Sequence, residues 1–482
     1  MFLRSGGSSG VKTLVGSRLP HRSRPVPRHL GGRALIGLLR LIPLLGFLSA
    51  TLVAPLDSAA ARRWPTGTEL LGVQNIEGVI LVKARMLGLR GRDTTGLLVL
   101  DTGAGFLSLD GHAAVDLGLS DSLSDSQIGL SDRALPRLEV GGLQIDQVTP
   151  VLTLDVSLVG RLTDRPVLGL LGQRVLVGRT VLIDYVNQTV ALIAAYPEGA
   201  GKRDSVRTPR GGGPERSPAE LTEDIADSRA RLTGLLSPHA RPVPFRLAGD
   251  GKMLVRARVS NPGPPHFSVW LTLIVDTGAT KCVLFDEALS DLVPGSRSWT
   301  ALRGLSATTL MGASNARLVR IPTIELEAPQ RVACPDVDAA LMKSEISGVL
   351  SRAVAEPVQG LLGYSSLRHY DVAIDYRSGI LWLDPLKKPA DDRPYEYSQV
   401  GLQLERRGET LRVMAVAEDS PAAVAGIAVG DELTAIDGQP TAQSGIIAMT
   451  RRLEGRPGTR VEITIRRGST ERAYTLVRRR LL

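Results

Sequence analysis

Two aspartates, Asp101 and Asp276, each begin the tetrapeptide Asp-Thr-Gly-Ala. Each tetrapeptide follows one short apolar run and precedes another, a pattern typical of a strand, a tight turn and a second strand. Two carboxyl groups about 3 Å apart cannot both ionise, so they share one proton and their pKa values separate. One carboxyl can then accept a proton while the other donates one. The sequence therefore predicts an acid–base pair where the two turns meet.

The segments that follow the two tetrapeptides repeat as well. Leu-Leu-Gly occurs at 170–172 and again at 361–363. Asp-Tyr follows each of those glycines by twelve residues, at 184–185 and 375–376, and precedes a strand-like run. Matching features in the same order indicate an internal repeat rather than two chance tripeptides.

The residues beside the aspartates suit two turns that approach one another. Gly103 and Gly278 lack a Cβ, so the two backbones can come close together. Thr102 and Thr277 carry hydroxyls that can both donate and accept a hydrogen bond across the contact. We expect these residues to hold the two carboxyl groups coplanar.

These motifs resemble the retropepsin-like aspartic proteases, particularly their bacterial members, over roughly residues 66–196 and 248–386. The resemblance implies a mainly β fold, with two retropepsin-like (acid protease) β-barrel lobes in tandem in one chain. It implies Asp101 and Asp276 as the catalytic dyad, with neither metal nor cofactor. The implied supporting residues of the two loops are Thr102, Gly103, Ala104, Thr277, Gly278 and Ala279.

The activity implied is that of an aspartic endopeptidase, in which water between Asp101 and Asp276 attacks a peptide bond of an extended peptide or protein substrate. The alternative is a catalytically inactive, exported peptide-binding scaffold on the same fold. Retroviral members carry an acidic residue after Asp-Thr-Gly-Ala, whereas this chain has Gly105 and Thr280, so substrate contacts there are expected to differ.

The family's glycine-containing flap has two counterparts in this chain. The second half offers Met311, Gly312 and Ala313, and the first half offers Gly129 in a short segment flanked by Ser and Asp. We expect the second-half flap to dominate closure over the substrate. The first-half segment reads equally well as an ordinary hairpin turn.

Residues 395–482 resemble a PDZ domain of the circularly permuted bacterial kind, with α+β structure. The resemblance rests on Val400-Gly401-Leu402, on the segment 420–440 and on the segment 457–468. PDZ domains bind an extended C-terminus by adding a strand to a sheet edge. We therefore expect Val400, Gly401 and Leu402 to hold the carboxylate of a C-terminal peptide. The alternative is a structural PDZ domain with an occupied groove.

The repeat and the PDZ segment divide the chain. We expect a first lobe at 62–198, a linker at 199–246, a second lobe at 247–386 and the PDZ domain at 395–482. In the linker, Ser217-Pro218-Ala219-Glu220 forms a capping box with proline at the first helical position, which predicts one amphipathic helix.

The net charge of +9 suggests nucleic-acid binding, but its location argues against it. Residues 1–61 hold eight basic residues and one acidic residue, so seven of the nine excess charges lie there. A basic stretch, the apolar run 41–54 and the small residues 58–61 together predict a secretory signal. The alternative is an uncleaved anchor that associates with the inner membrane through residues 34–54. Both predict an exported protein, in the periplasm or on the extracytoplasmic face of the membrane.

Histidine and cysteine are two further residue types that could do chemistry. The six histidines show no metal-binding spacing, so no metal site is predicted. Cys282 and Cys334 both lie in the second half, where either a disulfide or two buried thiols is compatible with the sequence.

Overall fold

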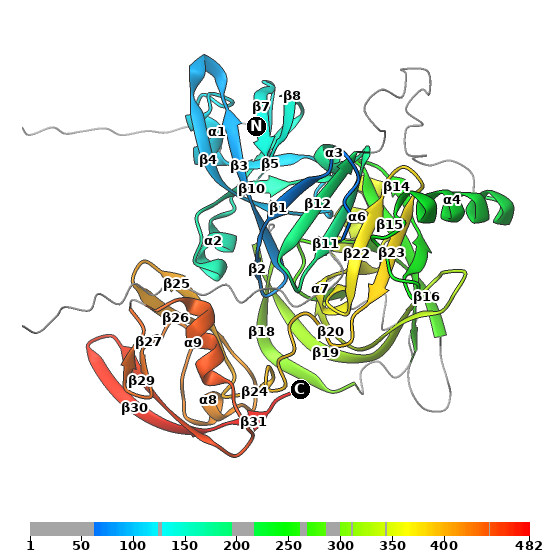
Figure 1. The fold of residues 1–482 in the computed structure, drawn as a ribbon. Helices are drawn as coiled ribbons and strands as arrows, with labels where there is room; N and C mark the ends of the chain where they lie inside the picture. The colour runs from blue at the N-terminus through cyan, green and yellow to red at the C-terminus, as the bar shows by residue number, and fades with distance from the viewer. Residues whose placement is uncertain are drawn as a thin grey trace, which may run out of the picture. The chain divides into compact units, whose positions relative to one another are not determined.

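The structure is a computed structural model that describes residues 62–123, 128–194, 216–260, 268–285, 299–309, 312–342, 345–442 and 444–482. The predicted leader, at 1–61, and Met311 lie outside the described residues. The described chain is mainly β (Figure 1). No helix within these ranges is long and apolar enough to cross a membrane.

The first half of the repeat forms one large sheet. Its strands are β2 (Gln74–Ile76), β3 (Val79–Leu87), β4 (Asp93–Leu100), β5 (Leu107–Asp110), β6 (Ile128–Ser131), β7 (Leu135–Val140), β8 (Leu143–Val148), β9 (Val151–Leu154) and β10 (Val167–Leu171). They are ordered β6-β9-β5-β10-β4-β3-β7-β8, and β2 pairs with β3. The helical segments of this half are η1 (Leu89–Gly91), α1 (Gly111–Asp116), α2 (Ser157–Thr163) and α3 (Gln173–Leu176).

The second half forms a separate sheet. Its strands are β14 (Arg246–Ala248), β15 (Lys252–Ser260), β16 (Ser268–Val275), β17 (Cys282–Phe285), β18 (Ala301–Thr309), β19 (Gly312–Leu326), β20 (Val332–Met342) and β21 (Gly360–Leu362). They are ordered β14-β15-β16-β21-β17-β20-β19-β18, and β15 also pairs with β19, so the sheet closes on itself. The helices here are α6 (Glu345–Val354) and α7 (Tyr364–Leu367).

The two halves share the strand arrangement around each Asp-Thr-Gly turn. In the first half, β10 lies between β4, to which it is parallel, and β5, to which it is antiparallel. In the second half, β21 lies in the same way between β16 and β17. The strand that carries Leu-Leu-Gly is thus inserted between the strands before and after the turn. The repeat in the sequence is therefore also a repeat in the fold.

A third sheet joins the two halves. It contains β1 (Glu69–Gly72), β11 (Arg179–Asp184), β12 (Thr189–Ala194), β13 (Arg241–Pro244), β22 (Tyr370–Asp375) and β23 (Ile380–Pro385). Their order is β1-β12-β11-β22-β23-β13, and the junction pairs Val181 of β11 with Ile374 of β22. Both side chains are fully buried. The Asp-Tyr hairpins of the repeat therefore supply the connection between the halves.

Helix α4 (Pro218–Arg231) covers one face of the joining sheet. Ser217 caps it, accepting a hydrogen bond from the backbone of Glu220, whose side chain accepts one from the Ser217 backbone in return. Ser228 accepts a hydrogen bond from the Trp382 indole at 2.8 Å. Leu221 and Ile225 pack against the apolar cluster on this sheet.

The C-terminal part has its own apolar core and sheet. The strands are β25 (Leu402–Arg407), β26 (Thr410–Val416), β27 (Glu432–Ile436), β28 (Gln439–Pro440), β29 (Arg460–Arg467) and β30 (Thr470–Val477). Helices α8 (Pro421–Val424) and α9 (Ile446–Leu453) pack on them, and β24 (Ser398–Gln399) pairs with β31 (Arg479–Arg480). Strand β25 is an edge strand of the sheet, with β26 as its only partner within the described residues.

Candidate functional site

The two Asp-Thr-Gly turns fold in the same way. Asp101 follows β4, and its Oδ1 accepts the backbone N–H groups of Gly103 at 2.8 Å and Ala104 at 3.0 Å. Asp276 follows β16, and its Oδ1 accepts those of Gly278 at 2.9 Å and Ala279 at 3.1 Å. Each aspartate therefore closes its own turn with one oxygen and leaves the other free for a partner.

The two turns are joined by their threonines. The Thr102 hydroxyl accepts the Thr277 N–H at 3.0 Å and donates to the Val275 carbonyl at 2.9 Å. Reciprocally, the Thr277 hydroxyl accepts the Thr102 N–H at 3.1 Å and donates to the Leu100 carbonyl at 2.8 Å. Both threonines are fully buried. These four bonds fix one turn against the other.

The glycines allow the carboxyl groups to meet. A Cβ at Gly103 would lie 2.6 Å from Cγ of Asp276, and a Cβ at Gly278 would lie 2.7 Å from Cγ of Asp101. No real Cβ approaches another heavy atom so closely, so any side chain at either position would displace the opposite carboxyl group. The expected close approach of the two turns is present, and the two aspartates are brought together.

The Leu-Leu-Gly motifs lie directly behind the turns. The Leu171 carbonyl accepts the Asp101 N–H at 3.1 Å, and the Leu362 carbonyl accepts the Asp276 N–H at 3.0 Å. A Cβ at Gly172 would lie 2.1 Å from the carbonyl oxygen of Phe106. The equivalent atom at Gly363 would lie 2.2 Å from that of Lys281. The motif therefore packs against the turn in both halves.

Burial and proximity shape the protonation of the pair. Burial of the Asp276 carboxyl raises its pKa well above the usual value of 3.8, and the negative charge of Asp101 raises it further. Burial also raises the pKa of Asp101, against the opposing effect of its backbone hydrogen bonds. The two carboxyls interact directly, so they hold a proton as a unit. Such a pair can accept one proton and donate another in the same site.

One cavity of about 880 Å³ contains this pair and part of the C-terminal domain. Its lining includes both aspartates, the apolar side of α2, the β18–β19 hairpin, the edge strand β25 and the helix α9. The residues from the C-terminal domain that line it include Gly401, Leu402, Gln403, Leu404, Ile446, Ile447 and Thr450. The two aspartates and the edge strand β25 therefore face the same space.

The two predicted flap segments differ in their position relative to the cavity. Strand β6, which contains Gly129, is the outermost strand of its sheet and pairs with β9. Gly129 is not among the described residues that line the cavity, and its assignment to a first-half flap stays a prediction. In the second half, Gly312 and Ala313 pair with Thr309 and Thr308 in the β18–β19 hairpin. This hairpin does line the cavity, through residues that include Leu302 and Leu318.

The predicted carboxylate-binding loop is a tight turn at the start of β25. Gly401 has φ of +90°, which favours glycine, and a Cβ there would lie 2.2 Å from Cβ of Ser420. The Val400 and Gly401 carbonyls accept the N–H groups of Ala422 at 2.9 Å and Ala417 at 2.8 Å. Gly401 and Leu402 border the cavity.

The two cysteines are free and buried. Cys282 lies 3.1 Å from the Ser366 hydroxyl, and Cys334 lies 3.6 Å from the Tyr370 hydroxyl. Burial raises the pKa of both thiols. Of the two alternatives left by the sequence, the structure has two separate thiols.

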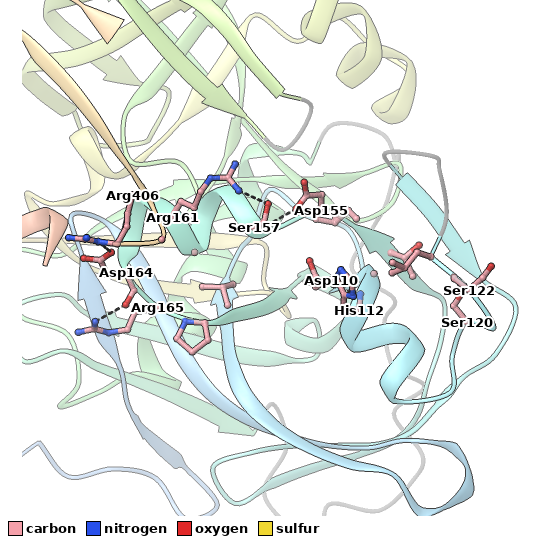
Figure 2. Close-up of a pocket in the computed structure, with 18 residues that line it drawn as sticks. Asp110, His112, Ser120, Ser122, Asp155, Ser157, Arg161, Asp164, Arg165 and Arg406 are labelled. Carbon is pink, nitrogen blue, oxygen red and sulfur yellow. Dashed lines mark hydrogen bonds and ion pairs between the residues drawn. The ribbon is translucent and has the colours of Figure 1, made fainter. Parts of the chain in front are cut away.

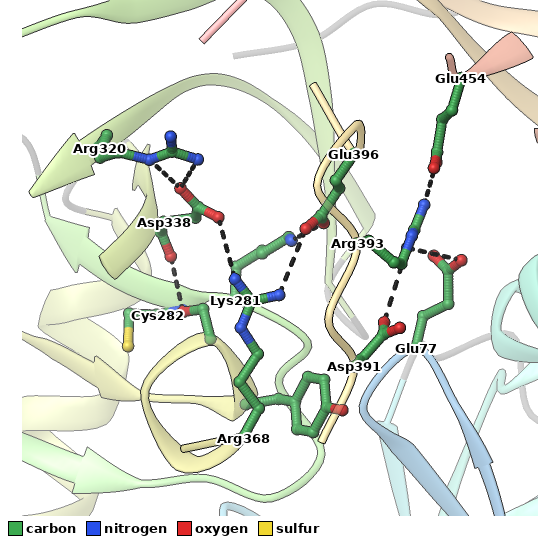
Figure 3. Close-up of polar contacts among 12 residues, drawn as sticks. Glu77, Lys281, Cys282, Arg320, Asp338, Arg368, Asp391, Arg393, Glu396 and Glu454 are labelled. Atoms are coloured by element: carbon green, nitrogen blue, oxygen red, sulfur yellow. Dashed lines mark hydrogen bonds and ion pairs between the residues drawn. The ribbon is translucent and has the colours of Figure 1, made fainter. Parts of the chain in front are cut away.

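An ion cluster that the sequence analysis did not identify includes Lys281, which follows the second turn in the sequence (Figure 3). Lys281 contacts Glu396 at 2.5 Å, and Arg368 contacts the same carboxylate at 3.3 Å. Burial opposes ionisation of Glu396, but the charges of Lys281, Arg393 and Arg368 outweigh it and lower its pKa to about 2. Arg393 in turn contacts Glu77 at 2.9 Å and also contacts Glu454. The segment before the C-terminal domain is thus held to both halves of the repeat and to Glu454, the residue that follows α9.

The threonine bonds generate a stability prediction. Thr102→Val keeps the shape of the side chain but leaves the Thr277 N–H and the Val275 carbonyl without their partners. We expect the free energy of unfolding to fall by roughly 2–6 kcal/mol, since two buried groups are left unsatisfied and each costs about 1–3 kcal/mol. Thr102→Ser keeps the hydroxyl and should lose only about 1 kcal/mol for the missing methyl group. Urea unfolding of the three proteins measures this, and equal stability of the Val and Ser variants would contradict it.

The raised pKa of Asp276 generates a prediction for pH. The unfolded chain releases this proton near pH 4, whereas the folded chain retains it to higher pH, so the stability due to the protonated carboxyl is lost as pH rises. Asp276→Asn cannot lose a proton. Between pH 4 and 7, the wild type should therefore lose stability relative to Asp276→Asn, by up to about 1.4 kcal/mol per pH unit. Urea unfolding across this range measures the difference, and a constant difference would refute the shift.

Comparison with known proteins identifies the C-terminal domain. The family model described as "PDZ domain" matches residues 412–467. A probable CtpA-like serine protease of Staphylococcus haemolyticus (strain JCSC1435) is 27% identical over 95 residues, which are 20% of this chain and 19% of that protein. A protein of the same name from Staphylococcus saprophyticus is 26% identical over 88 residues, 18% of each chain. This chain thus spans about a fifth of the length of these curated relatives.

Two solved structures are similar over a short part of the chain. A photosystem II D1 C-terminal processing protease has 26% identity and a TM-score of 0.17, and covers 17% of this chain and 23% of its own. The PDZ domain of a carboxy-terminal protease from Vibrio cholerae, in complex with peptide, has 15% identity and a TM-score of 0.16. It covers 17% of this chain and 94% of its own.

These relatives correct the prediction of activity. Both curated relatives are named serine proteases, so the prediction of an aspartic endopeptidase, with water activated between Asp101 and Asp276, is contradicted. The coarser prediction, a protease and hence a hydrolase, agrees with their names. The prediction of a PDZ domain is confirmed: residues 412–467 are a PDZ domain.

Proposed function

We propose that this chain is a hydrolase of the proteolytic class that captures a polypeptide by its carboxyl end in the PDZ groove. The observation that carries the proposal is the shared cavity, which is lined by β25 and α9 as well as by Asp101 and Asp276. PDZ domains bind a C-terminus as an added strand at a sheet edge. The last residues of a polypeptide paired with β25 would therefore lie in the space that contains the carboxyl pair. The names of the relatives support the proteolytic class.

For the architecture, we propose two lobes of retropepsin-like fold, at 62–198 and 247–386, followed by the PDZ domain at 395–482. The matching pairing of β10 and β21 with their neighbours supports this proposal. So do the reciprocal bonds between Thr102 and Thr277. A fold does not by itself assign a reaction, so the nucleophile is a separate question.

For the site, we propose Asp101 and Asp276 as an acid–base pair and Val400, Gly401 and Leu402 as the carboxylate-binding loop. The names of the relatives favour a serine nucleophile. In the described part of the chain, serine hydroxyls hydrogen-bond to side chains of Arg, Glu, Asp, Trp and Cys rather than of Lys or His. An experiment must therefore distinguish a serine nucleophile from the carboxyl pair.

The test uses the full chain and two pools of ten-residue peptides that differ only in a free or an amidated carboxyl end. Mass spectrometry detects the products. We expect cleavage of the free-carboxyl pool and at least tenfold slower cleavage of the amidated pool, because amidation removes the charge that the loop binds. Asp276→Asn tests separately whether cleavage needs the carboxyl pair, and a serine-directed fluorophosphonate tests the serine class that the names of the relatives support. Asp132→Asn, at an exposed carboxylate of the first lobe, is the matched control and should cleave as the wild type does.

Three results would contradict parts of this proposal. If neither peptide pool is cleaved, the proposed hydrolase activity is wrong. Equal cleavage of both pools would refute capture through the carboxyl end. Full activity in Asp276→Asn, with inactivation by a serine-directed fluorophosphonate, would refute the role of the carboxyl pair and assign the reaction to a serine.

A further inference from the structure

The PDZ groove lies between β25 and α9, and different groups close its two ends. The carboxylate-binding loop lies where β25 begins, at Leu402, and the strand ends at Arg407. A peptide that pairs with β25 and places its carboxyl end at this loop must run back along the strand toward Arg407. Its earlier residues then pass the start of α9, at Ile446. The end of the groove near Arg407 is therefore where the remainder of a long polypeptide must leave.

A carboxylate from the first lobe occupies that exit. Oδ1 of Asp164 accepts a hydrogen bond from Nε of Arg406 at 2.8 Å, and Oδ2 accepts one from the backbone N–H of Ile446 at 2.5 Å. One side chain thus connects the edge strand to the first residue of α9, across the groove. Arg161 of α2 adds an ion pair with Glu405 at 3.7 Å.

The segment that carries Asp164 also separates two cavities. A second cavity of about 860 Å³ is bordered by both lobe and PDZ residues, including Asp110, His112, Asp164, Arg165 and Arg406 (Figure 2). Asp155 and Arg161, on either end of α2, line both this cavity and the one that contains the carboxyl pair. Helix α2 and Asp164 therefore form the partition between the PDZ groove and the second cavity.

We propose that the Asp164 side chain, through its bonds to Arg406 and Ile446, closes the exit of the PDZ groove and that a captured polypeptide must displace it. We call this side chain the Asp164 clasp. While the Asp164 bonds are intact, the groove has room only for ligand residues that pair with residues 402–405 of β25. That is roughly four ligand residues in extended pairing. A longer chain meets the Asp164 carboxylate at Arg406. Binding it requires both hydrogen bonds of Asp164 to break and Arg406 to release the Ser444 carbonyl, which opens the groove into the second cavity. The inference rests on the proposed capture of carboxyl ends by the PDZ domain.

The backbone at Asp164 suits a glycine. Asp164 has φ of +53°, in the left-handed region that glycine adopts without strain. Asp164→Gly therefore removes the carboxylate while keeping the backbone of the turn. Asp132→Gly, at an exposed aspartate of the same lobe, is the matched control.

The experiment compares two peptides on the full chain. The first is the tightest-binding tetrapeptide from a synthetic array with valine at the carboxyl end, chosen because Leu402, Leu404 and Ile447 make the cavity wall apolar. The second is the same tetrapeptide extended at its amino end by six Gly and Ser residues, which add length without a new side-chain contact. Fluorescence anisotropy gives the dissociation constants.

In the wild type, the extended peptide should bind roughly tenfold more weakly than the tetrapeptide, because two charge-assisted hydrogen bonds must be broken. In Asp164→Gly the two peptides should bind equally, with the affinity for the tetrapeptide unchanged. Asp132→Gly should behave as the wild type does. Hydrogen exchange at the Ile446 amide should quicken when the extended peptide is added and remain unchanged with the tetrapeptide.

Equal affinities in the wild type, with slow exchange at Ile446 in both complexes, would overturn the clasp while leaving the proposed capture intact. A length penalty that persists in Asp164→Gly would also overturn it. If the array contains no tetrapeptide that binds, capture by the PDZ groove is itself wrong and the clasp is refuted with it.

Discussion

The reciprocal hydrogen bonds of Thr102 and Thr277 are the constraint on which the rest of the site depends. Each hydroxyl satisfies a backbone N–H and a backbone carbonyl of the opposite half, all without access to water. A buried polar group without a partner is costly, so the two halves have one favourable register rather than many. In that register the glycines face the opposite carboxyl groups, and Asp101 and Asp276 must share the space between them.

The other connections maintain this register from a distance. The joining sheet pairs Val181 with Ile374, and the Leu-Leu-Gly strands hydrogen-bond to the aspartate of each turn. The ion cluster of Lys281, Glu396 and Arg368 holds the segment that leads into the PDZ domain against the second half. Electrostatics and packing thus place the edge strand β25 of the PDZ domain in the same cavity as Asp101 and Asp276, and α2 contributes to the walls of that cavity.

The sequence predicted the parts of the site that are encoded locally. Asp-Thr-Gly forms a turn through bonds between neighbouring residues, and its repetition indicated that two turns would meet. Pattern reasoning did not find the Asp164 clasp, because Asp164 and Arg406 are 242 residues apart and neither belongs to a recognisable motif. The resemblance predicts Gly129 in a first-half flap, with an ordinary hairpin turn as the alternative, and the structure has Gly129 in β6, which pairs with β9 at the edge of the sheet. The class of protease was inferred from the turns, and the relatives matched in the comparison carry a different class name.

The central claim is that a polypeptide held by its carboxyl end in the PDZ groove lies in the cavity of Asp101 and Asp276. Photo-crosslinking tests it most directly, with a ten-residue peptide that carries a benzophenone side chain at the third residue from a free carboxyl end. We predict crosslinks to β25 or α9 and to walls of the cavity in the lobes, such as α2 or the β18–β19 hairpin, with loss of labelling when the carboxyl end is amidated. Crosslinks confined to surfaces outside this cavity, or equal labelling by the amidated peptide, would contradict the account.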